Sequence, residues 1–292
     1  MTLELFDPKA ETAPRMDSLT SIPDSRRTVF GRIGSLEVRL AVSRQEVEAA
    51  QVIRYRVFVE EMGAELPVEA MRARRDFDKF DDICDHLIVL DNAIEGDTAE
   101  QIVATYRLLR QEVAARHSGF YSASEFDIEP LIARHPDKKF MELGRSCVLP
   151  PYRTKRTVEL LWQGNWAYSV KHGLDVMFGC ASFHGSVPEL HALALSFLHH
   201  NALAKDEWAV KAAGPHACNM DLMPAEAANA KRALMAMPPL IKGYLRLGAM
   251  IGEGAVVDRP FGTTDVLIVL PVESISSRYV NYYGAGAERF AS

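Results

Sequence analysis

The stretch between residues 140 and 180 restricts the possible folds of this chain more than any other stretch. Residues 140–149 have the apolar composition of a buried strand that ends before two prolines. Residues 154–172 then repeat apolar side chains at helical spacing, and Gly173 is placed to end that helix. Residues 174–180 are again typical of a buried strand. A strand, a helix and a strand in succession indicate an α/β fold.

Further strands and helices are predicted on both sides of this unit. Ser43 and Glu46 form a capping pair that begins a helix, directly after a stretch of alternating apolar and polar residues. The predicted strands are 36–42, 86–90, 102–109 and 265–270, and the other predicted helices are 188–205 and 240–251. This mixed order predicts one α/β domain with helices on both faces of a mixed sheet.

The chain has no obvious linker that would divide it. Residues 1–30 are rich in Pro, Ser, Thr and charged residues and have no period, so we expect a flexible N-terminal segment. Residues 31–292 are expected to form a single domain that contains a helical insertion at about 185–238.

The composition excludes several classes of protein. The net charge of −6 argues against a nucleic-acid-binding surface, and the four cysteines, which lack a CxxC pair, predict neither a zinc site nor a disulfide framework. No apolar run approaches the roughly 20 residues of a membrane-spanning helix, and residues 1–14 lack the apolar core of a secretory signal. We expect a cytoplasmic protein in a reducing compartment, with membrane contact at most peripheral.

Basic residues gather at the start of the helix predicted at 154–172. They are Arg153, Lys155 and Arg156. A helix N-terminus attracts anions because its first N–H groups lack partners, and a basic side chain beside it adds charge-assisted hydrogen bonds to phosphate. The sequence therefore predicts a phosphate-binding turn, and solvated surface charge is the alternative.

Two ionisable residues interrupt the apolar strand at 140–149. Glu142 and Arg145 are three positions apart, so a regular strand would place them on opposite faces, but a bulge at Gly144 would bring them together. A half-buried glutamate with a raised pKa suits a general base near neutral pH. The alternative is a structural ion pair.

Arg54 and an acidic run are a second group of candidates. Arg54 lies in the middle of the apolar side of the first predicted helix, where a charge needs a carboxylate, a carbonyl or a ligand as its partner. Asp76, Asp78 and Asp81 lie close together, and His86 follows them. Such carboxylates can hold an amine or a metal, or they can form a solvated loop. The spacing and the glycine of a calcium loop are missing, and we expect no metal site.

The residue pattern resembles that of the acyl-homoserine lactone synthases, GNAT-fold enzymes that take acyl groups from acyl carrier protein. The matching blocks are Arg54-x-x-Val57-Phe58, Asp78-x-Phe80-Asp81, His86-Leu87, Arg107-Leu108 and Glu142-x-x-Arg145. The chain departs from those enzymes after the Val-Phe block, where Glu61-Met62-Gly63-Ala64 replaces an expected tryptophan.

A closer resemblance, over nearly the whole chain, is to the bacterial L-ornithine N-alpha-acyltransferases of ornithine-lipid synthesis. It includes the segment Gly243-Tyr244-Leu245-Arg246-Leu247-Gly248-Ala249. This resemblance implies a GNAT-like, splayed sheet, a 3-hydroxyacyl carrier protein as donor, ornithine as acceptor and lyso-ornithine lipid as product. We expect no cofactor other than the phosphopantetheine arm of the carrier protein. Residues 153–158 lack the glycines of the usual acetyl-CoA loop, which favours the carrier protein as donor.

The chemistry of N-acylation suggests roles for the candidate residues. Glu142 is expected to remove a proton from the amine, directly or through water, with Arg145 beside it. Backbone N–H groups around Cys147 and Val148 are expected to bind the thioester oxygen. The remaining substrate contacts are assigned to Arg54, Asp78, Asp81, His86 and Arg107, and the contacts with the carrier protein to Arg153, Lys155 and Arg156. Asp78 and Asp81 are the candidates for the cationic side chain of the acceptor, and Arg54 or Arg145 for its carboxylate.

Two other functions stay open. One is an enzyme like the acyl-homoserine lactone synthases with another amine acceptor, and the other is a non-catalytic protein that binds acyl carrier protein or lipid. A last expectation concerns the inner membrane, because Leu190, Leu193, Ala194, Phe197 and Leu198 give the helix at 188–205 an apolar side that suits a lipid interface. Packing of that side on the protein core is the alternative.

Overall fold

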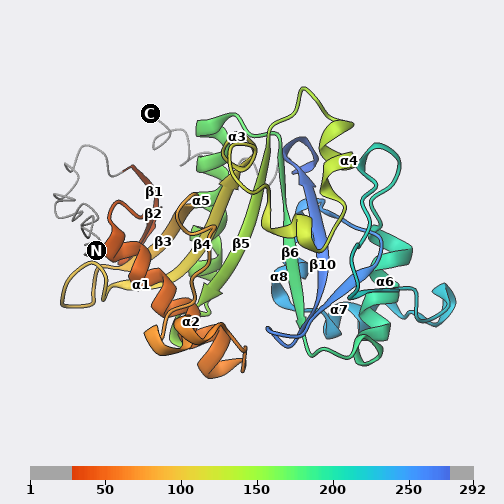
Figure 1. Ribbon diagram of the computed structural model, residues 1–292, viewed down its shortest axis with the longest axis horizontal. Helices are drawn as coiled ribbons and strands as arrows, with labels where there is room; N and C mark the ends of the chain where they lie inside the picture. Colours follow the sequence, from red (N-terminus) through yellow and green to blue (C-terminus); the bar gives the residue numbers. More distant parts are fainter. Residues whose placement is uncertain (1–27, 277–292) are drawn as a thin grey trace, which may run out of the picture.

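The computed structural model describes residues 28–276, and within them one open sheet of ten strands runs through the molecule (Figure 1). The strand order is β1-β2-β3-β4-β5-β6-β10-β9-β7, and β8 pairs with β10 beside this path. Only β5 and β6 are parallel neighbours along this path, and all its other pairs are antiparallel. The sheet is therefore mixed, as predicted. The expected flexibility at 1–30 concerns residues that are almost all outside the described part.

Both halves of the sheet carry long central strands and shorter outer ones. The strands are β1 Val29–Ile33, β2 Leu36–Leu40, β3 Asp85–Asp91, β4 Ile102–Arg110, β5 Phe140–Val148, β6 Val176–His184, β7 Ala217–Cys218, β8 Met250–Ile251, β9 Ala255–Asp258 and β10 Thr263–Pro271. The α-helices are α1 Arg44–Tyr55, α2 Val68–Ala73, α3 Gln111–Ala114, α4 Ile128–Ala133, α5 Lys155–His172, α6 Ala192–Ala202, α7 Ala230–Ala236 and α8 Pro239–Leu247.

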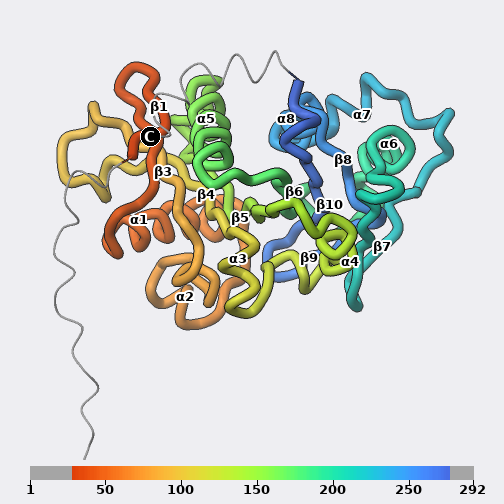
Figure 2. Tube along the Cα trace, turned by 90° about the horizontal axis from the view of Figure 1, so that it is seen from above, coloured from red at the N-terminus to blue at the C-terminus, as the bar shows by residue number. Residues whose placement is uncertain are grey.

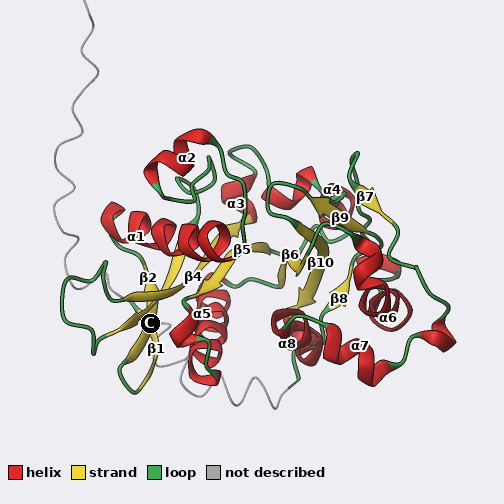
Figure 3. Cartoon of the chain, turned by 90° about the horizontal axis from the view of Figure 1, so that it is seen from below, coloured by secondary structure: helices red, strands yellow, loops and turns green. Residues whose placement is uncertain are grey.

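Helices cover both faces of the sheet. Figure 3 shows α1 and α2 on one side, and α5 and α8 on the other. Helix α5 packs on β1 to β4, whereas α8 packs on β6 and β10. The resulting layers place the apolar side chains of β3 and β4 between helices on both sides, which explains why these two strands are almost entirely buried. In β5 the first four residues are buried, and most of the later ones are half-buried.

The predicted helix ends are confirmed by their caps. The hydroxyl of Ser43 accepts a hydrogen bond of 3.2 Å from the N–H of Glu46 at the start of α1. Thr154 caps α5 in the same way, and Gly173 ends it in the left-handed region at φ 59°. The helix predicted at 240–251 ends earlier, at Leu247, because Gly248 turns the chain at φ 97° before β8 begins. The short strands β1, β7, β8 and β9 were not predicted, because their residues show no alternating pattern.

The sheet is splayed between β5 and β6. The two strands pair only from Phe140 to Glu142, opposite Val176 to Phe178. Beyond this point the carbonyl oxygen of Leu143 lies so close to Gly179 that a Cβ atom at Gly179 would be 2.1 Å from it. A glycine is therefore required where the two backbones come closest, and the strands diverge after it.

The region from 185 to 238 contains α6 and α7, which Figure 2 shows at the opposite end of the molecule from β1. The prediction that the apolar side of the first helix here faces a lipid surface is wrong. Ala194 and Leu198 of α6 are buried, and Leu193 and Phe197 pack against the core. Only Leu190 is exposed, because it precedes α6 in a separate short turn. Within residues 28–276, no helix combines the length and the apolar composition needed to cross a bilayer.

Candidate active site

A cavity of about 670 Å³ lies where β5 and β6 diverge. Its wall includes polar residues of β4 and β5, the turn that begins at Tyr121, and residues of β6 and β10. Apolar residues from other elements complete it, namely Val57, Phe58, Met62, Val158, Leu161, Trp162, Leu240 and Phe261. The cavity thus joins a buried polar region to an apolar wall, a combination that suits a substrate with both kinds of group.

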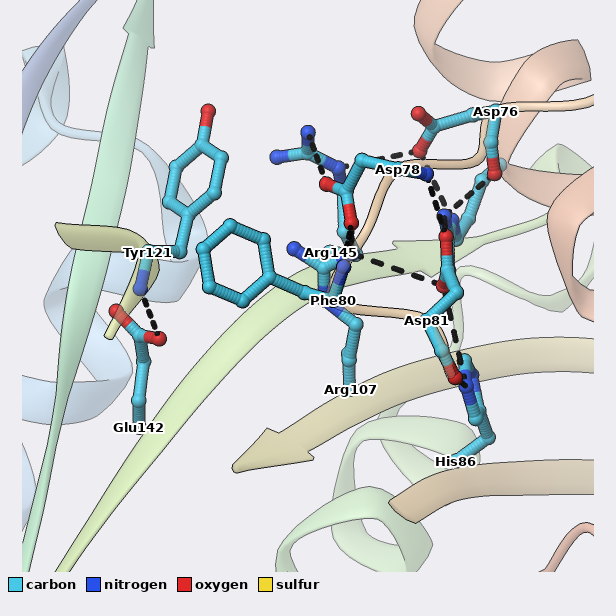
Figure 4. A network of polar contacts seen from close by, with 10 residues as sticks. Asp76, Asp78, Phe80, Asp81, His86, Arg107, Tyr121, Glu142 and Arg145 are labelled. Atoms are coloured by element: carbon cyan, nitrogen blue, oxygen red, sulfur yellow. Dashed lines mark hydrogen bonds and ion pairs between the residues drawn. The ribbon is translucent and has the colours of Figure 1, made fainter. Parts of the chain in front are cut away.

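Glu142 lies in this cavity wall and is 5% exposed. Its carboxylate accepts a hydrogen bond of 2.8 Å from the N–H group of Tyr121 (Figure 4). It also accepts from the N–H group of Ser122, at 2.7 Å, and from the hydroxyl of Ser122. Burial raises the pKa of Glu142, and the hydrogen bonds from Ser122 and Tyr121 oppose that rise. The result is a fixed carboxylate inside the cavity.

Arg145 occupies a bulge of β5. Arg145 and Ser146 together lie opposite the single residue Tyr106, and Arg145 has a positive φ of 50°. The bulge was predicted at Gly144 and lies one residue later. It turns the guanidinium of Arg145 onto the rings of Tyr121 and Phe261, at 4.8 Å and 4.6 Å from their centres. Glu142 and Arg145 therefore line one cavity, but each has other partners.

Most of the predicted acidic and basic residues form a buried ion-pair network beside the cavity (Figure 4). Arg54 is fully buried and contacts Asp76 at 2.9 Å and Asp81 at 2.6 Å. Arg107 contacts Asp78 at 2.7 Å. Arg145 reaches Asp76 at 3.2 Å and Asp78 at 3.4 Å. Three arginines thus neutralise three aspartates, which explains how such residues are tolerated inside the protein.

His86 completes this network without adding charge. Its Nε2 atom lies 3.0 Å from the carbonyl oxygen of Asp81, and burial lowers the pKa of the imidazole. Of the residues assigned to substrate, Arg107, Arg145, Cys147 and Val148 line the cavity. Arg54, Asp78, Asp81 and His86 are not among the lining residues and hold the acidic loop against β3 and β4.

The predicted basic turn lies at the rim of the cavity. Arg153 and Lys155 line it, and Arg156 follows on the first turn of α5. Arg153 pairs with Glu61 at 2.6 Å and Lys155 with Glu159 at 3.3 Å, and all these basic side chains are exposed to solvent. Their position gives the entrance an accessible positive edge next to a helix N-terminus.

Several residues of the cavity were not predicted. Tyr121 and Ser122 hold Glu142, Phe261 stacks on Arg145, and Asp258 and Asp265 line the wall from β9 and β10. Asp265 could have been predicted as a functional residue, because it is an acid in a nine-residue strand, β10, whose residues are all buried. Tyr121, Ser122 and Phe261 lie in turns, and Asp258 ends the four-residue strand β9, so the sequence carries no period that would have revealed them.

Comparison with known proteins identifies the family. The chain is 65% identical over 285 residues to the L-ornithine N(alpha)-acyltransferase of Agrobacterium fabrum, covering 98% of this chain and 94% of that protein. The chain belongs to the L-ornithine N(alpha)-acyltransferase family. The protein of that name from Rhizobium meliloti is 64% identical over 304 residues, which cover all of this chain and 99% of the relative.

The chain has two further similarities to known proteins. The model of the acetyltransferase (GNAT) domain matches residues 53–163, which span α1 to the first half of α5 and so include Glu142 and Arg145. Among solved structures, the acyl-homoserine lactone synthase LasI is similar at 10% identity and a TM-score of 0.40, covering 86% of this chain and 96% of LasI. The family and the GNAT fold expected from the sequence are thus both confirmed.

Proposed function

We propose that this chain transfers a 3-hydroxyacyl group from acyl carrier protein to the α-amine of L-ornithine, giving lyso-ornithine lipid. The proposal is carried by the 65% identity, over nearly the full length of both chains, to a protein named L-ornithine N(alpha)-acyltransferase. The cavity supports it, since Glu142 and Arg145 lie in the same wall as an apolar surface for an acyl chain.

Glu142 is proposed as the base. An α-amine with a pKa near 8 is mostly protonated at neutral pH and must lose a proton before it attacks. The neutral amine then attacks the thioester carbonyl carbon, a C–N bond forms, and the C–S bond breaks. Glu142 takes the proton of the amine, directly or through water, and the phosphopantetheine thiolate leaves and is protonated. The hydrogen bonds from Tyr121 and Ser122 keep the carboxylate in position for this step.

Direct transfer is proposed rather than an acyl-enzyme. Burial raises the pKa of the Cys147 thiol to about 12 and that of Cys180 well above its ordinary value. A thiol must ionise to become a strong nucleophile, so neither residue is suited to accept the acyl group at neutral pH. Backbone N–H groups of β5 around Cys147 and Val148 are the proposed donors to the thioester oxygen.

Acyl carrier protein is the proposed donor. Its single phosphodiester would lie at the N-terminus of α5, where Arg153, Lys155 and Arg156 provide positive charge. The absence of glycine from residues 153–158 leaves little room for the close backbone approach that a pyrophosphate needs. The product carries a long acyl chain, so we also propose that the enzyme works at the cytoplasmic face of the inner membrane.

Lipids extracted from cells test the proposal. Bacteria that lack ornithine lipids are made to produce this chain or its Glu142→Gln variant, and total lipids are analysed by mass spectrometry. The proposal predicts 3-hydroxyacyl ornithine in cells with the unchanged chain and little in cells with the variant. Accumulation of another acylated amine, or of none with normal protein levels, would contradict it.

A further inference from the structure

Three acidic residues gather beside the part of the cavity wall that β9 and β10 form. They are Glu125, which follows the turn at Tyr121, Asp258 at the end of β9, and Asp265 near the start of β10. Each offers a carboxylate oxygen within 4.8 Å of the others. Asp258 and Asp265 are part of the cavity wall, so the group faces the space available to a substrate.

The carboxylate of Asp265 has an atom that lacks a partner. The residue is only 6% exposed, and in the described part of the chain its Oδ1 atom is buried without a hydrogen bond. The hydroxyls of Thr263 and Ser182 lie close enough to stabilise the charged form of Asp265, but they do not offset the effect of burial on its pKa. A buried polar atom without a partner is costly, and it is usually retained where a ligand supplies that partner.

The three acids also lack an ion-pair partner in the described part of the chain, since Arg145, which acts on Glu125 and Asp265 from a longer distance, pairs with Asp76 and Asp78. Residues 28–276 contain no ion pair to any of the three, and Glu125 accepts only the thiol of Cys180, at 3.1 Å. Burial, followed by repulsion from the other acids, raises the pKa of Glu125 to about 7 and that of Asp265 to about 6. In contrast, Asp76, Asp78 and Asp81 are matched by three arginines. The excess negative charge of the cavity is thus concentrated beside this part of the wall.

Contacts link this acidic group to Glu142. Ser122 donates to Glu142 from the same turn that leads to Glu125, and Cys180, which contacts Glu125, also lines the cavity. The acidic group and the proposed base therefore share one stretch of wall formed by this turn and β6.

We propose that Glu125, Asp258 and Asp265 bind the side-chain ammonium of the acceptor, and so select amino acids that end in a cation. This inference rests on the function proposed above. The ammonium would donate to Oδ1 of Asp265 and balance the clustered charge, while the α-amine of the same molecule lies toward Glu142. These three acids replace Asp78 and Asp81 as the candidates for binding the cationic side chain, because Asp78 and Asp81 already form ion pairs with Arg54, Arg107 and Arg145.

Paired acceptors test the assignment. Purified wild-type protein, Asp265→Asn and Asp258→Asn are assayed with an acyl carrier protein thioester and either L-ornithine or L-norvaline, which has the same carbon chain without the second amine. Both variants should lower kcat/KM for ornithine by roughly 10²-fold or more, because the ammonium would lose a charged hydrogen-bond acceptor inside a buried site. Their activity toward norvaline should fall far less than their activity toward ornithine, so the ratio of the two activities should drop, and a cooperative thermal unfolding transition shows separately that they fold.

The outcomes separate this inference from the proposed function. If the wild-type protein acylates ornithine and both variants keep the wild-type ratio of ornithine to norvaline activity, the inference is overturned and the proposed function stands. If the wild-type protein acylates neither amino acid, the proposed function fails first. Thermal stabilisation of the wild-type protein by Mg²⁺ or Ca²⁺, lost in Asp265→Asn while discrimination is kept, would assign the acids to a metal instead. Asp137→Asn, which removes an exposed charge elsewhere, should behave as wild type.

Discussion

At the scale of single residues, the buried carboxylates of the cavity differ in what surrounds them. Glu142 accepts three hydrogen bonds from one turn, whereas Oδ1 of Asp265 accepts none within the described residues. In the first environment, hydrogen bonds hold the carboxylate in place and oppose the rise in pKa that burial causes, whereas in the second Oδ1 is left for a ligand. This contrast is why we assign Glu142 to chemistry and Asp265 to binding.

The substitution Glu142→Gln tests the first assignment. Turnover should fall by about 10²-fold or more, because an amide cannot accept the amine proton. The amide would also place a donor against a backbone N–H group, so thermal stability should fall moderately. Ser122→Ala is the control, since it removes one hydrogen bond and keeps the carboxylate, and it should retain most activity. Near-wild-type turnover in folded Glu142→Gln would exclude Glu142 as the base.

The substitution Asp265→Asn should stabilise the ligand-free protein at alkaline pH. The pKa of Asp265 is raised from its ordinary 3.8 to about 6, so the folded state binds more protons than the unfolded state between these values and loses stability as the pH rises from about 4 to about 6, with little further change above. At 1.36 kcal/mol per unit, the wild-type penalty is on the order of 3 kcal/mol at pH 8. The groups that face Asp265 are Asp258, Glu125, Arg145, Ser182 and Thr263.

Denaturant unfolding between pH 4 and pH 8 measures this effect. The gain of Asp265→Asn over wild type should be largest at pH 8, shrink as the pH falls through 6 and disappear near pH 4. A gain that is equal at both ends of this range would show that the charge of Asp265 is not its cause. Asp137→Asn serves again as the exposed control.

The sequence identified which residues are charged and inward-facing, but not how they pair. Asp76 is 22 residues from Arg54 and Asp78 is 67 residues from Arg145 along the chain, so no local sequence pattern predicts these contacts. Arg54 was correctly predicted to need a partner, and its partners are carboxylates of the protein. Asp265 was missed because residues 265–270 were read as strand alone, although an acid in a buried strand is itself a signal.

At the scale of secondary-structure elements, capped helices and long strands were predictable and short strands were not. Ser43, Thr154 and Gly173 fix the ends of α1 and α5 through local hydrogen bonds that the sequence displays directly. β7 and β8 have two residues each, and only pairing with distant strands defines them. The apolar side of α6 was assigned to a membrane because periodicity alone cannot distinguish a core from a lipid surface.

The first turn of α5 leads to a prediction about the donor. Replacing Arg153, Lys155 and Arg156 by alanine should raise KM for acyl carrier protein and flatten its dependence on salt, because exposed charges act on encounter and are screened. Stability should change little, since exposed pairs such as Arg153 with Glu61 contribute at most about 1 kcal/mol.

Steady-state kinetics at several salt concentrations provides the measurement. Alanine at the exposed residues Arg72, Arg116 and Lys231 removes the same charge from other surfaces and should leave KM unchanged. Equal effects of the two triple variants, or a change confined to kcat, would place carrier-protein docking elsewhere.

At the scale of the whole molecule, the splay of one sheet creates the cavity. β5 and β6 are neighbours in the only strand–helix–strand crossover that the sequence clearly predicted, and they part after Glu142. The cavity between them is lined by charged residues of β4 and β5, which contact the acidic loop. Apolar residues of α5 and α8 and carboxylates of β9 and β10 complete the lining. The sequence predicted the fold class and the first of these contributions. The last depends on strands paired at the far side of the cavity, which only the folded chain reveals.

Reconstitution with purified components tests the central claim most directly. The protein is incubated with a 3-hydroxyacyl carrier protein and L-ornithine, and the product is fragmented in a mass spectrometer to locate the acyl group. The account predicts one amide at the α-nitrogen, a free side-chain amine and release of one carrier-protein thiol for each product formed. An acyl group on the side-chain nitrogen, or thiol release without an ornithine amide, would contradict it.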